Sequence, residues 1–80
     1  MILYVKPGCP WCDDAEEWLE TRGFAYRRVD VISDRAAYSR MREISGQTLA
    51  PTLEMMDGEV LPDFDTGQLE KFLRRRGDLR

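Results

Sequence analysis

Two cysteines, Cys9 and Cys12, are the residues of this chain best suited to chemistry, and they are its only cysteines. A thiolate can attack a disulfide to form a mixed disulfide, and a second thiol nearby can resolve that intermediate. A C-x-x-C pair near a β-α-β pattern is typical of this redox chemistry. The surrounding segment reads Lys6-Pro7-Gly8-Cys9-Pro10-Trp11-Cys12. The spacing therefore predicts a dithiol site for thiol–disulfide exchange.

The position of Cys9 at a predicted helix start favours its ionised form. A short apolar strand, residues 2–5, precedes the motif, and apolar residues at helical spacing follow it. A helix N-terminus carries about half a positive charge and several unpaired N–H groups, which favour an anion. Cys9 is predicted to be the N-cap, Pro10 the first helical residue, and Lys6 a nearby cation. We therefore assign Cys9 as nucleophile and Cys12, further into the helix and less acidic, as resolving thiol.

Three other interpretations of the cysteine pair remain. A structural disulfide at this spacing would close a very short loop and would constrain the unfolded chain little. A zinc site needs four ligands, and without histidine it would have to recruit carboxylates such as Asp13 or a second subunit. Two unrelated buried thiols are disfavoured by the prolines and glycine around them. Redox chemistry is the favoured interpretation, with no metal site expected.

Length and charge predict one small domain, residues 1–80, with a modest core. The net charge of −3 does not favour a nucleic-acid partner, and the arginines at 74–76 are expected to stabilise a helix end. No apolar stretch is long enough to cross a membrane, and the first residues do not form a secretory signal. We expect a cytoplasmic monomer in a reducing compartment, where a disulfide is transient and catalytic.

Seven elements are predicted in the order β-α-β-α-β-β-α. The strands are expected at residues 2–5, 24–31, 52–56 and 59–61, and the helices at residues 10–22, 34–45 and 65–76. Asp57-Gly58 predicts a two-residue hairpin turn between the last two strands. A right-handed crossover pairs the first two strands in parallel. The result is an α/β fold with a four-stranded mixed sheet flanked by three helices.

Residues 4–12, which end in Cys9-Pro10-Trp11-Cys12, resemble the active-site segment of glutaredoxins, the small glutathione-linked members of the thioredoxin superfamily. The resemblance extends more loosely over nearly the whole chain. It implies a thioredoxin-like fold in which Pro51 is cis and lies beside the cysteines. It also implies that the backbone at Ala50 pairs with the substrate.

The same resemblance implies a glutathione site. Lys6 would contact a glutathione carboxylate, Ala50 would pair with its cysteinyl unit, and Phe64 and Asp65 would hold its γ-glutamyl end. Trp11, between the cysteines on the first turn of the helix, is expected to form an aromatic rim beside the attacking sulfur. A second role for Asp65 follows from the sequence, because Asp65 and Gln68 have the spacing of a capping box.

Two departures from the glutaredoxin pattern concern glutathione. Leu49 stands where glutaredoxins usually have threonine, and Pro62-Asp63 stands where they usually have a Gly-Gly pair. Glycines let a ligand approach the backbone closely, whereas proline removes an N–H donor and aspartate adds a negative charge. These changes weigh against glutathione binding and leave the thiol chemistry untouched, and the Pro62-Asp63 departure favours thioredoxin reductase as the reductant.

The Cys-Pro-Trp-Cys motif and Lys6 favour glutathione, and we expect a glutathione-dependent thiol–disulfide oxidoreductase that reduces protein disulfides and glutathione mixed disulfides through Cys9 and Cys12. Glutathione would be a co-substrate rather than a bound cofactor, and the partners would be disulfide-containing or glutathionylated proteins. One alternative is an electron donor that is itself reduced by thioredoxin reductase. Another is a non-enzymatic module that carries an iron–sulfur cluster or docks a partner, although proline after the first cysteine disfavours the cluster in this family.

Overall fold

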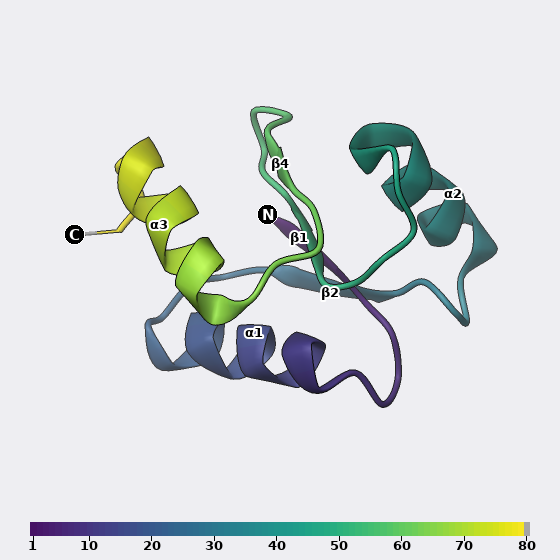
Figure 1. Cartoon of the computed structure of the whole chain (residues 1–80), viewed down its shortest axis with the longest axis horizontal. Helices are drawn as coiled ribbons and strands as arrows, with labels where there is room; N and C mark the ends of the chain where they lie inside the picture. The colour runs from purple at the N-terminus through teal and green to yellow at the C-terminus, as the bar shows by residue number, and fades with distance from the viewer. Residues whose placement is uncertain (80) are drawn as a thin grey trace.

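The predicted order of elements is confirmed in the computed structural model, which describes residues 1–79. The elements are β1 (Ile2–Val5), α1 (Pro10–Thr21), β2 (Arg27–Asp30), α2 (Arg35–Ser45), β3 (Thr52–Glu54), β4 (Val60–Leu61) and α3 (Thr66–Arg76). Figure 1 shows the chain coloured along its length. Within the described part of the chain, no helix is long and apolar enough to span a membrane.

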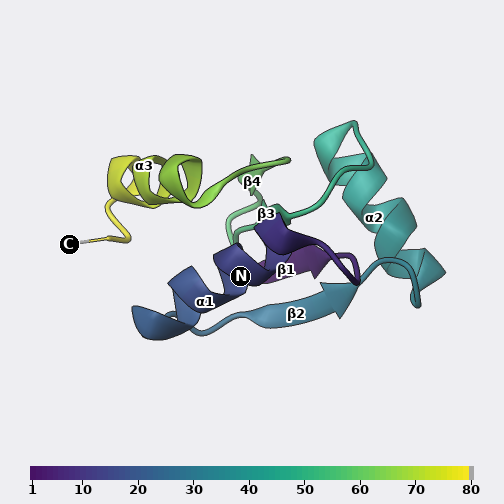
Figure 2. The ribbon, with the colours of Figure 1, turned by 60° about the horizontal axis from the view of Figure 1, so that its bottom comes forward.

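The strands form the predicted mixed sheet, in the spatial order β2-β1-β3-β4. β1 is parallel to β2, as Figure 2 shows, and antiparallel to β3, which in turn is antiparallel to β4. In the β1–β3 ladder Tyr4 lies opposite Thr52. This register matters for the site because it brings the segment before β3 to the end of β1, where the cysteine motif begins.

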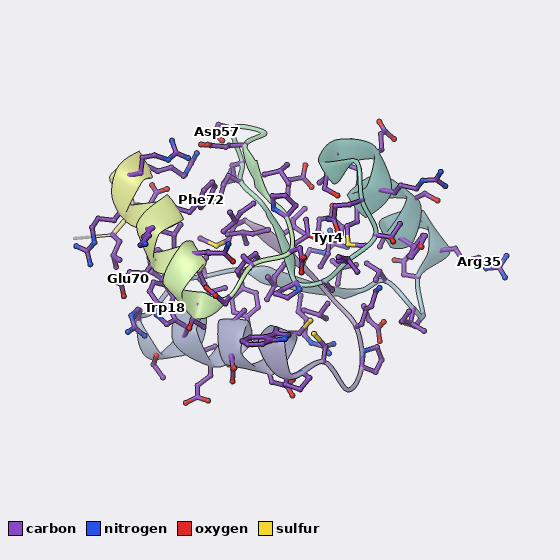
Figure 3. All side chains as sticks on the ribbon, viewed as in Figure 1. Tyr4, Trp18, Arg35, Asp57, Glu70 and Phe72 are labelled. Carbon is purple, nitrogen blue, oxygen red and sulfur yellow. The ribbon has the colours of Figure 1, made fainter. Side chains whose placement is uncertain are left out.

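Helices cover both faces of the sheet, α1 and α3 on one and α2 on the other (Figure 1). The larger core cluster includes Leu3 and Val5 of β1 packed with side chains of α1 and α3, whereas Tyr4 belongs to the smaller cluster under α2. Figure 3 shows Phe72 on the α3 side of the molecule and Tyr4 towards α2. The alternation of Leu3, Tyr4 and Val5 between the two clusters is expected because successive strand residues point to opposite faces of a sheet.

Three strand predictions were too long, since the strands are Arg27–Asp30, Thr52–Glu54 and Val60–Leu61 rather than residues 24–31, 52–56 and 59–61. The second strand begins at Arg27 rather than residue 24, and the residues before it pack on α1 instead of joining the ladder. The Phe24 ring stacks on Trp18, with centroids 6.0 Å apart, and the Tyr26 hydroxyl lies within hydrogen-bond distance of the carboxylates of Glu16, at 3.2 Å, and Glu20, at 3.1 Å. Side-chain packing on the helix therefore decides where the parallel pairing starts.

The hairpin prediction was also wrong in its length. β3 ends at Glu54. Gly58 N–H donates to the Met55 carbonyl at 3.0 Å, and Met55 N–H donates to the Glu59 carbonyl at 2.8 Å. The loop enclosed by these bonds has three residues, 56–58. Gly58 has φ +92, the left-handed conformation that closes such a loop. The predicted turn residues are used, but Asp57 occupies the second loop position and Gly58 the third.

The segment before β3 is held by a small network of polar side chains. Thr52 is fully buried, and its hydroxyl donates to the Leu49 carbonyl at 2.9 Å. The Gln47 amide donates to the Thr52 hydroxyl at 3.1 Å and to the Ser45 hydroxyl at 2.9 Å. These bonds fix the backbone on both sides of Ala50 without regular secondary structure.

We predict that Thr52→Val lowers the free energy of unfolding by about 1–3 kcal/mol, because it removes the buried hydroxyl that donates to the Leu49 carbonyl and accepts from the Gln47 amide while keeping the side-chain volume. Urea denaturation followed by tryptophan fluorescence measures the loss. Thr21→Val is the matched control, since the Thr21 hydroxyl is at an exposed helix end. It should change stability by less than about 0.5 kcal/mol, and equal losses in both variants would contradict the role given to Thr52.

Candidate active site

Cys9 caps the N-terminus of α1, as predicted. It has extended backbone angles, φ −102 and ψ 104, and its sulfur accepts the backbone N–H of Cys12 at 3.2 Å. The Cys9 carbonyl accepts the N–H of Asp13 at 3.1 Å, and Pro10 is the first helical residue. A sulfur at this position faces a donor N–H and the positive end of the helix dipole, both of which favour a thiolate.

Cys12 lies in a different environment from Cys9. It is buried in the core, 1 % exposed, whereas Cys9 is partly exposed. Burial, followed by a hydrogen bond with the Cys9 side chain, raises the pKa of the Cys12 thiol to about 12. Both cysteines are free thiols in this structure. At neutral pH Cys12 is therefore a protonated thiol beside a more accessible sulfur, the division of properties that the sequence predicts.

The loop before β3 lies against Cys9. The Cys9 sulfur is 3.9 Å from the Ala50 carbonyl oxygen, and the Ala50–Pro51 peptide bond is cis, as expected. Lys6 reaches the same loop, with its Nζ donating to the Thr48 carbonyl at 2.8 Å. The structure therefore brings Lys6, Ala50 and Pro51 together with the nucleophile. The ammonium of Lys6, which the resemblance assigns to glutathione, already has a backbone partner.

The remaining predicted site residues meet in a separate pocket. Trp11, 60 % exposed, and the residues before and at the start of α3 line an open pocket of about 180 Å³. These residues are Asp63, Phe64, Asp65 and Gln68. The pocket forms because α1 and α3 pack against each other on the same face of the sheet. Phe64 is only 3 % exposed, so its side chain belongs mainly to the core.

The groups that would hold a γ-glutamyl end are already used in capping α3. The Gln68 N–H donates to the Asp65 carboxylate at 2.8 Å, and the Asp65 N–H donates to the Gln68 side-chain oxygen at 2.9 Å. This is the reciprocal capping box that the sequence predicts. A ligand carboxylate that needs the Asp65 N–H would have to displace the Gln68 side chain.

Asp63 and Gln68 line the pocket, although the sequence prediction did not place them in the site and gave Gln68 only a capping role. Among residues 1–79, Asp63 is the only residue other than glycine with positive φ, at +44. Glycine adopts this conformation freely, and aspartate is among the few other residues that tolerate it. The position of Asp63 in place of the usual second glycine was therefore the signal that could have identified it, because a conformation suited to glycine is retained beside the pocket.

Leu49 is another exposed apolar residue close to the nucleophile. Its side chain is 52 % exposed, and it precedes Ala50 in the loop that faces Cys9. Trp11 and Leu49 thus place apolar surface on two segments beside the dithiol. Among residues 1–79 there is no group of three or more histidine, cysteine, aspartate or glutamate side chains that could hold a metal ion.

Other cavities lie away from the cysteines. One of about 500 Å³ is lined by the chain start, the β3–β4 hairpin and the end of α3, including Met1, Met55 and Arg76. A smaller cavity of about 220 Å³ lies beside Trp18 and Arg22 of α1. No cysteine lines either cavity or the pocket of about 180 Å³. That pocket is nevertheless the one relevant to the thiols, because it is lined by Trp11, which lies between Cys9 and Cys12 on the first turn of α1.

The chain is similar to known proteins over most of its length. Among curated proteins, an uncharacterised glutaredoxin-like 8.6 kDa protein of the rubredoxin operon of Clostridium pasteurianum is 27 % identical over 73 residues, covering 91 % of this chain and 96 % of that protein. The hybrid peroxiredoxin hyPrx5 of Haemophilus influenzae is 31 % identical over 49 residues, which cover 61 % of this chain and 20 % of hyPrx5.

Solved structures show the same fold. The thioredoxin-like protein BC3987 has a TM-score of 0.80 and 33 % identity, with 90 % of this chain and 97 % of that chain covered. A point mutant of the same protein gives a TM-score of 0.81 at 33 % identity, with 90 % and 96 % covered. Both neighbours support the thioredoxin-like fold that the sequence predicts.

A family model described as Glutaredoxin matches residues 1–61. The matched region contains Cys9, Cys12 and the cis Pro51, and it ends just before Pro62 and Asp63. The family match, the glutaredoxin-like relative and the thioredoxin-like neighbours agree. The chain therefore belongs to the glutaredoxin family of the thioredoxin superfamily.

Proposed function

We propose that the protein is a dithiol thiol–disulfide oxidoreductase that reduces disulfides through Cys9 and Cys12. The observation that carries this proposal is the position of the Cys9 sulfur. It accepts the Cys12 N–H at the start of α1 and is 3.9 Å from the carbonyl that precedes the cis Pro51. A partly exposed sulfur in an anion-stabilising position, with a buried thiol beside it, suits attack followed by resolution.

The reaction proceeds by two exchanges. The Cys9 thiolate attacks one sulfur of the substrate disulfide, forming a mixed disulfide and releasing the other substrate sulfur, which takes up a proton. Cys12 then loses its proton and attacks the Cys9 sulfur, so that a Cys9–Cys12 disulfide forms and the second substrate thiol leaves. The substrate gains two electrons and the protein loses two.

The burial of Cys12 suits this order of events. One cause of its raised pKa is its interaction with the Cys9 sulfur. Once Cys9 is part of a mixed disulfide it carries no negative charge, so this cause of the raised pKa of Cys12 is removed. The resolving thiol therefore becomes easier to ionise only after the first step has taken place.

Glutathione is the first candidate for the reductant that restores the dithiol. Two molecules of glutathione would reduce the Cys9–Cys12 disulfide and leave as glutathione disulfide. The family match supports this candidate, as does the presence of Lys6, Ala50 and Pro51 around Cys9 and of Trp11, Phe64 and Asp65 around the pocket. Glutathionylated proteins and protein disulfides would be the substrates.

A reductase of the thioredoxin type is the second candidate for the reductant. Three observations favour it: the closed capping box of Asp65 and Gln68, the tethered Lys6 ammonium, and Asp63 in a conformation typical of glycine. The capping box and the Lys6–Thr48 bond occupy donors that could bind the carboxylates of glutathione. Asp63 adds a negative charge where glutaredoxins usually have glycine. None of them alters the dithiol, so the chemistry is the same with either reductant.

Two coupled assays distinguish these reductants, and NADPH oxidation is the readout in both. The first supplies glutathione reductase, glutathione and a small mixed disulfide, and the second supplies thioredoxin reductase without glutathione. Activity in the first supports glutathione as reductant, and activity only in the second supports the reductase. Absence of activity in both assays, with correctly folded protein, would refute the oxidoreductase proposal and favour a binding role.

We predict that Cys9→Ser reduces activity with every disulfide to the background rate, because the attacking sulfur is lost. Cys12→Ser should retain reduction of glutathione mixed disulfides and lose reduction of protein disulfides, since free glutathione can replace the resolving thiol only in the first case. The glutathione-coupled assay measures reduction of glutathione mixed disulfides by both variants, and the assay of whichever reductant is active measures their reduction of protein disulfides, with thermal unfolding as a check on folding. An active Cys9→Ser variant would contradict the assignment of the nucleophile.

A further inference from the structure

The pocket beside the dithiol carries two carboxylates and no cation of its own. Its five lining residues include Asp63 and Asp65, and none of them is basic. No ion pair formed among residues 1–79 includes either aspartate. The pocket therefore presents a negative potential to any group that enters it while a disulfide is bound at Cys9.

The three arginines in the last turn of α3 are engaged in ion pairs. Their partners are Glu59, Asp57, Glu70 and Asp78. α3 has eleven residues, so its two ends are about 16 Å apart, which is beyond the Debye length of about 10 Å at 0.1 M salt. These arginines therefore do not neutralise the pocket at moderate salt.

The helix dipole gives the pocket little compensation. The first turn of α3 would ordinarily attract an anion, but the Asp65 carboxylate accepts the Gln68 N–H there and the Asp65 N–H is taken by the Gln68 side chain. On the other side of the dithiol, the Lys6 ammonium is bonded to the Thr48 carbonyl. An anionic ligand group would thus meet carboxylates, while a cationic group would also find the exposed ring of Trp11.

We propose that Asp63 is a specificity-determining residue that makes Cys9 react faster with disulfides bearing a cationic group than with disulfides bearing a carboxylate at the same place. This inference rests on the proposed disulfide reduction by Cys9 and Cys12. The recognised chemistry is an ammonium or guanidinium group a few bonds from the attacked sulfur. It belongs either to a basic side chain of a protein substrate or to an amine-bearing small thiol.

Asp63 can be changed without disturbing the backbone. Its φ of +44 is tolerated by asparagine and is easy for glycine, so Asp63→Asn removes the charge and keeps both the shape and the turn. Asp63→Gly restores the residue type that is usual at this position in the family. Glu43→Gln, at an exposed site on α2 across the sheet, is the matched control for the loss of one negative charge.

The test compares three small disulfides of similar size and different charge: cystamine, bis(2-hydroxyethyl) disulfide and dithiodiglycolate. The rate constant for reaction of the reduced protein with each is measured in stopped flow from tryptophan fluorescence. Each value is divided by the rate constant of dithiothreitol with the same disulfide, which cancels the intrinsic reactivity of the leaving thiol. The ratio of the normalised cystamine and dithiodiglycolate values is the charge preference.

We predict a charge preference of about tenfold for cystamine in the unmodified protein at low salt. One pair of charges about 5 Å apart in water alters a rate about fourfold, and the preference combines the attraction of the ammonium with the repulsion of the carboxylate. Asp63→Asn and Asp63→Gly should each lower the preference at least about threefold, and Glu43→Gln should leave it unchanged. Raising the salt concentration should lower the preference of the unmodified protein. Asp63→Gly should also react faster with glutathione disulfide.

The outcomes separate this inference from the proposed function. A protein that reacts with the neutral disulfide but shows no charge preference, or a preference that Asp63→Asn leaves intact, would overturn the role of Asp63 while the oxidoreductase proposal stands. No reaction with any disulfide would overturn both. Peptide mixed disulfides with lysine or glutamate beside the cysteine identify the source of the cation. A lysine preference that Asp63→Asn removes assigns it to a protein substrate, and a preference confined to cystamine assigns it to a small thiol.

Discussion

The hydrogen bond from the Cys12 N–H to the Cys9 sulfur is the interaction on which the site depends. It makes Cys9 the N-cap of α1, which fixes the sulfur at the positive end of the helix dipole. It also sets the depth of the second thiol, because Cys12 then lies on the first turn of a helix whose inner face is buried with Ala15, Trp18 and Leu19. One local cap thus produces an accessible sulfur and a buried thiol in close contact.

The sheet completes the site by bringing distant segments to the same helix end. β1 leads into the cysteine motif, and its antiparallel partner β3 begins directly after the cis Pro51, so the Ala50 carbonyl comes within 3.9 Å of the Cys9 sulfur. The packing of α3 beside α1 adds a pocket at Trp11. The buried core of Leu3, Leu19, Leu53 and Leu69 holds these segments together.

The dithiol and the carboxylates of the neighbouring pocket are located in different parts of this chain. The dithiol and the loop at Pro51 lie within residues 1–61, the region that matches the Glutaredoxin family model. Asp63 and Asp65 lie outside it, where the charge of the pocket is determined. In the proposed reaction, a negative pocket beside the dithiol would alter which disulfides approach Cys9 and would leave the exchange of electrons between sulfurs as it is. The preference for substrate charge and the reactivity of the thiols would then depend on different residues of this small domain.

Local signals in the sequence determined much of this protein. The N-cap at Cys9, the capping box of Asp65 and Gln68, the glycine that ends α2 and the order of the seven elements all depend on neighbouring residues, so they could be predicted. The cis bond at Pro51 was predicted through resemblance to the glutaredoxin family, since a lone proline carries no such signal.

Other features were decided only by the tertiary structure, because they depend on residues far apart in the chain. β2 starts at Arg27 because Phe24 and Tyr26 pack on α1, and spacing along the sequence does not reveal that competition. The engagement of Lys6 with the Thr48 carbonyl depends on the register between β1 and β3. The pocket that joins Trp11 to Asp63 exists only because two helices more than forty residues apart in sequence pack side by side. Residue types and spacing could therefore identify the reactive thiols, while the surroundings of those thiols required the folded chain.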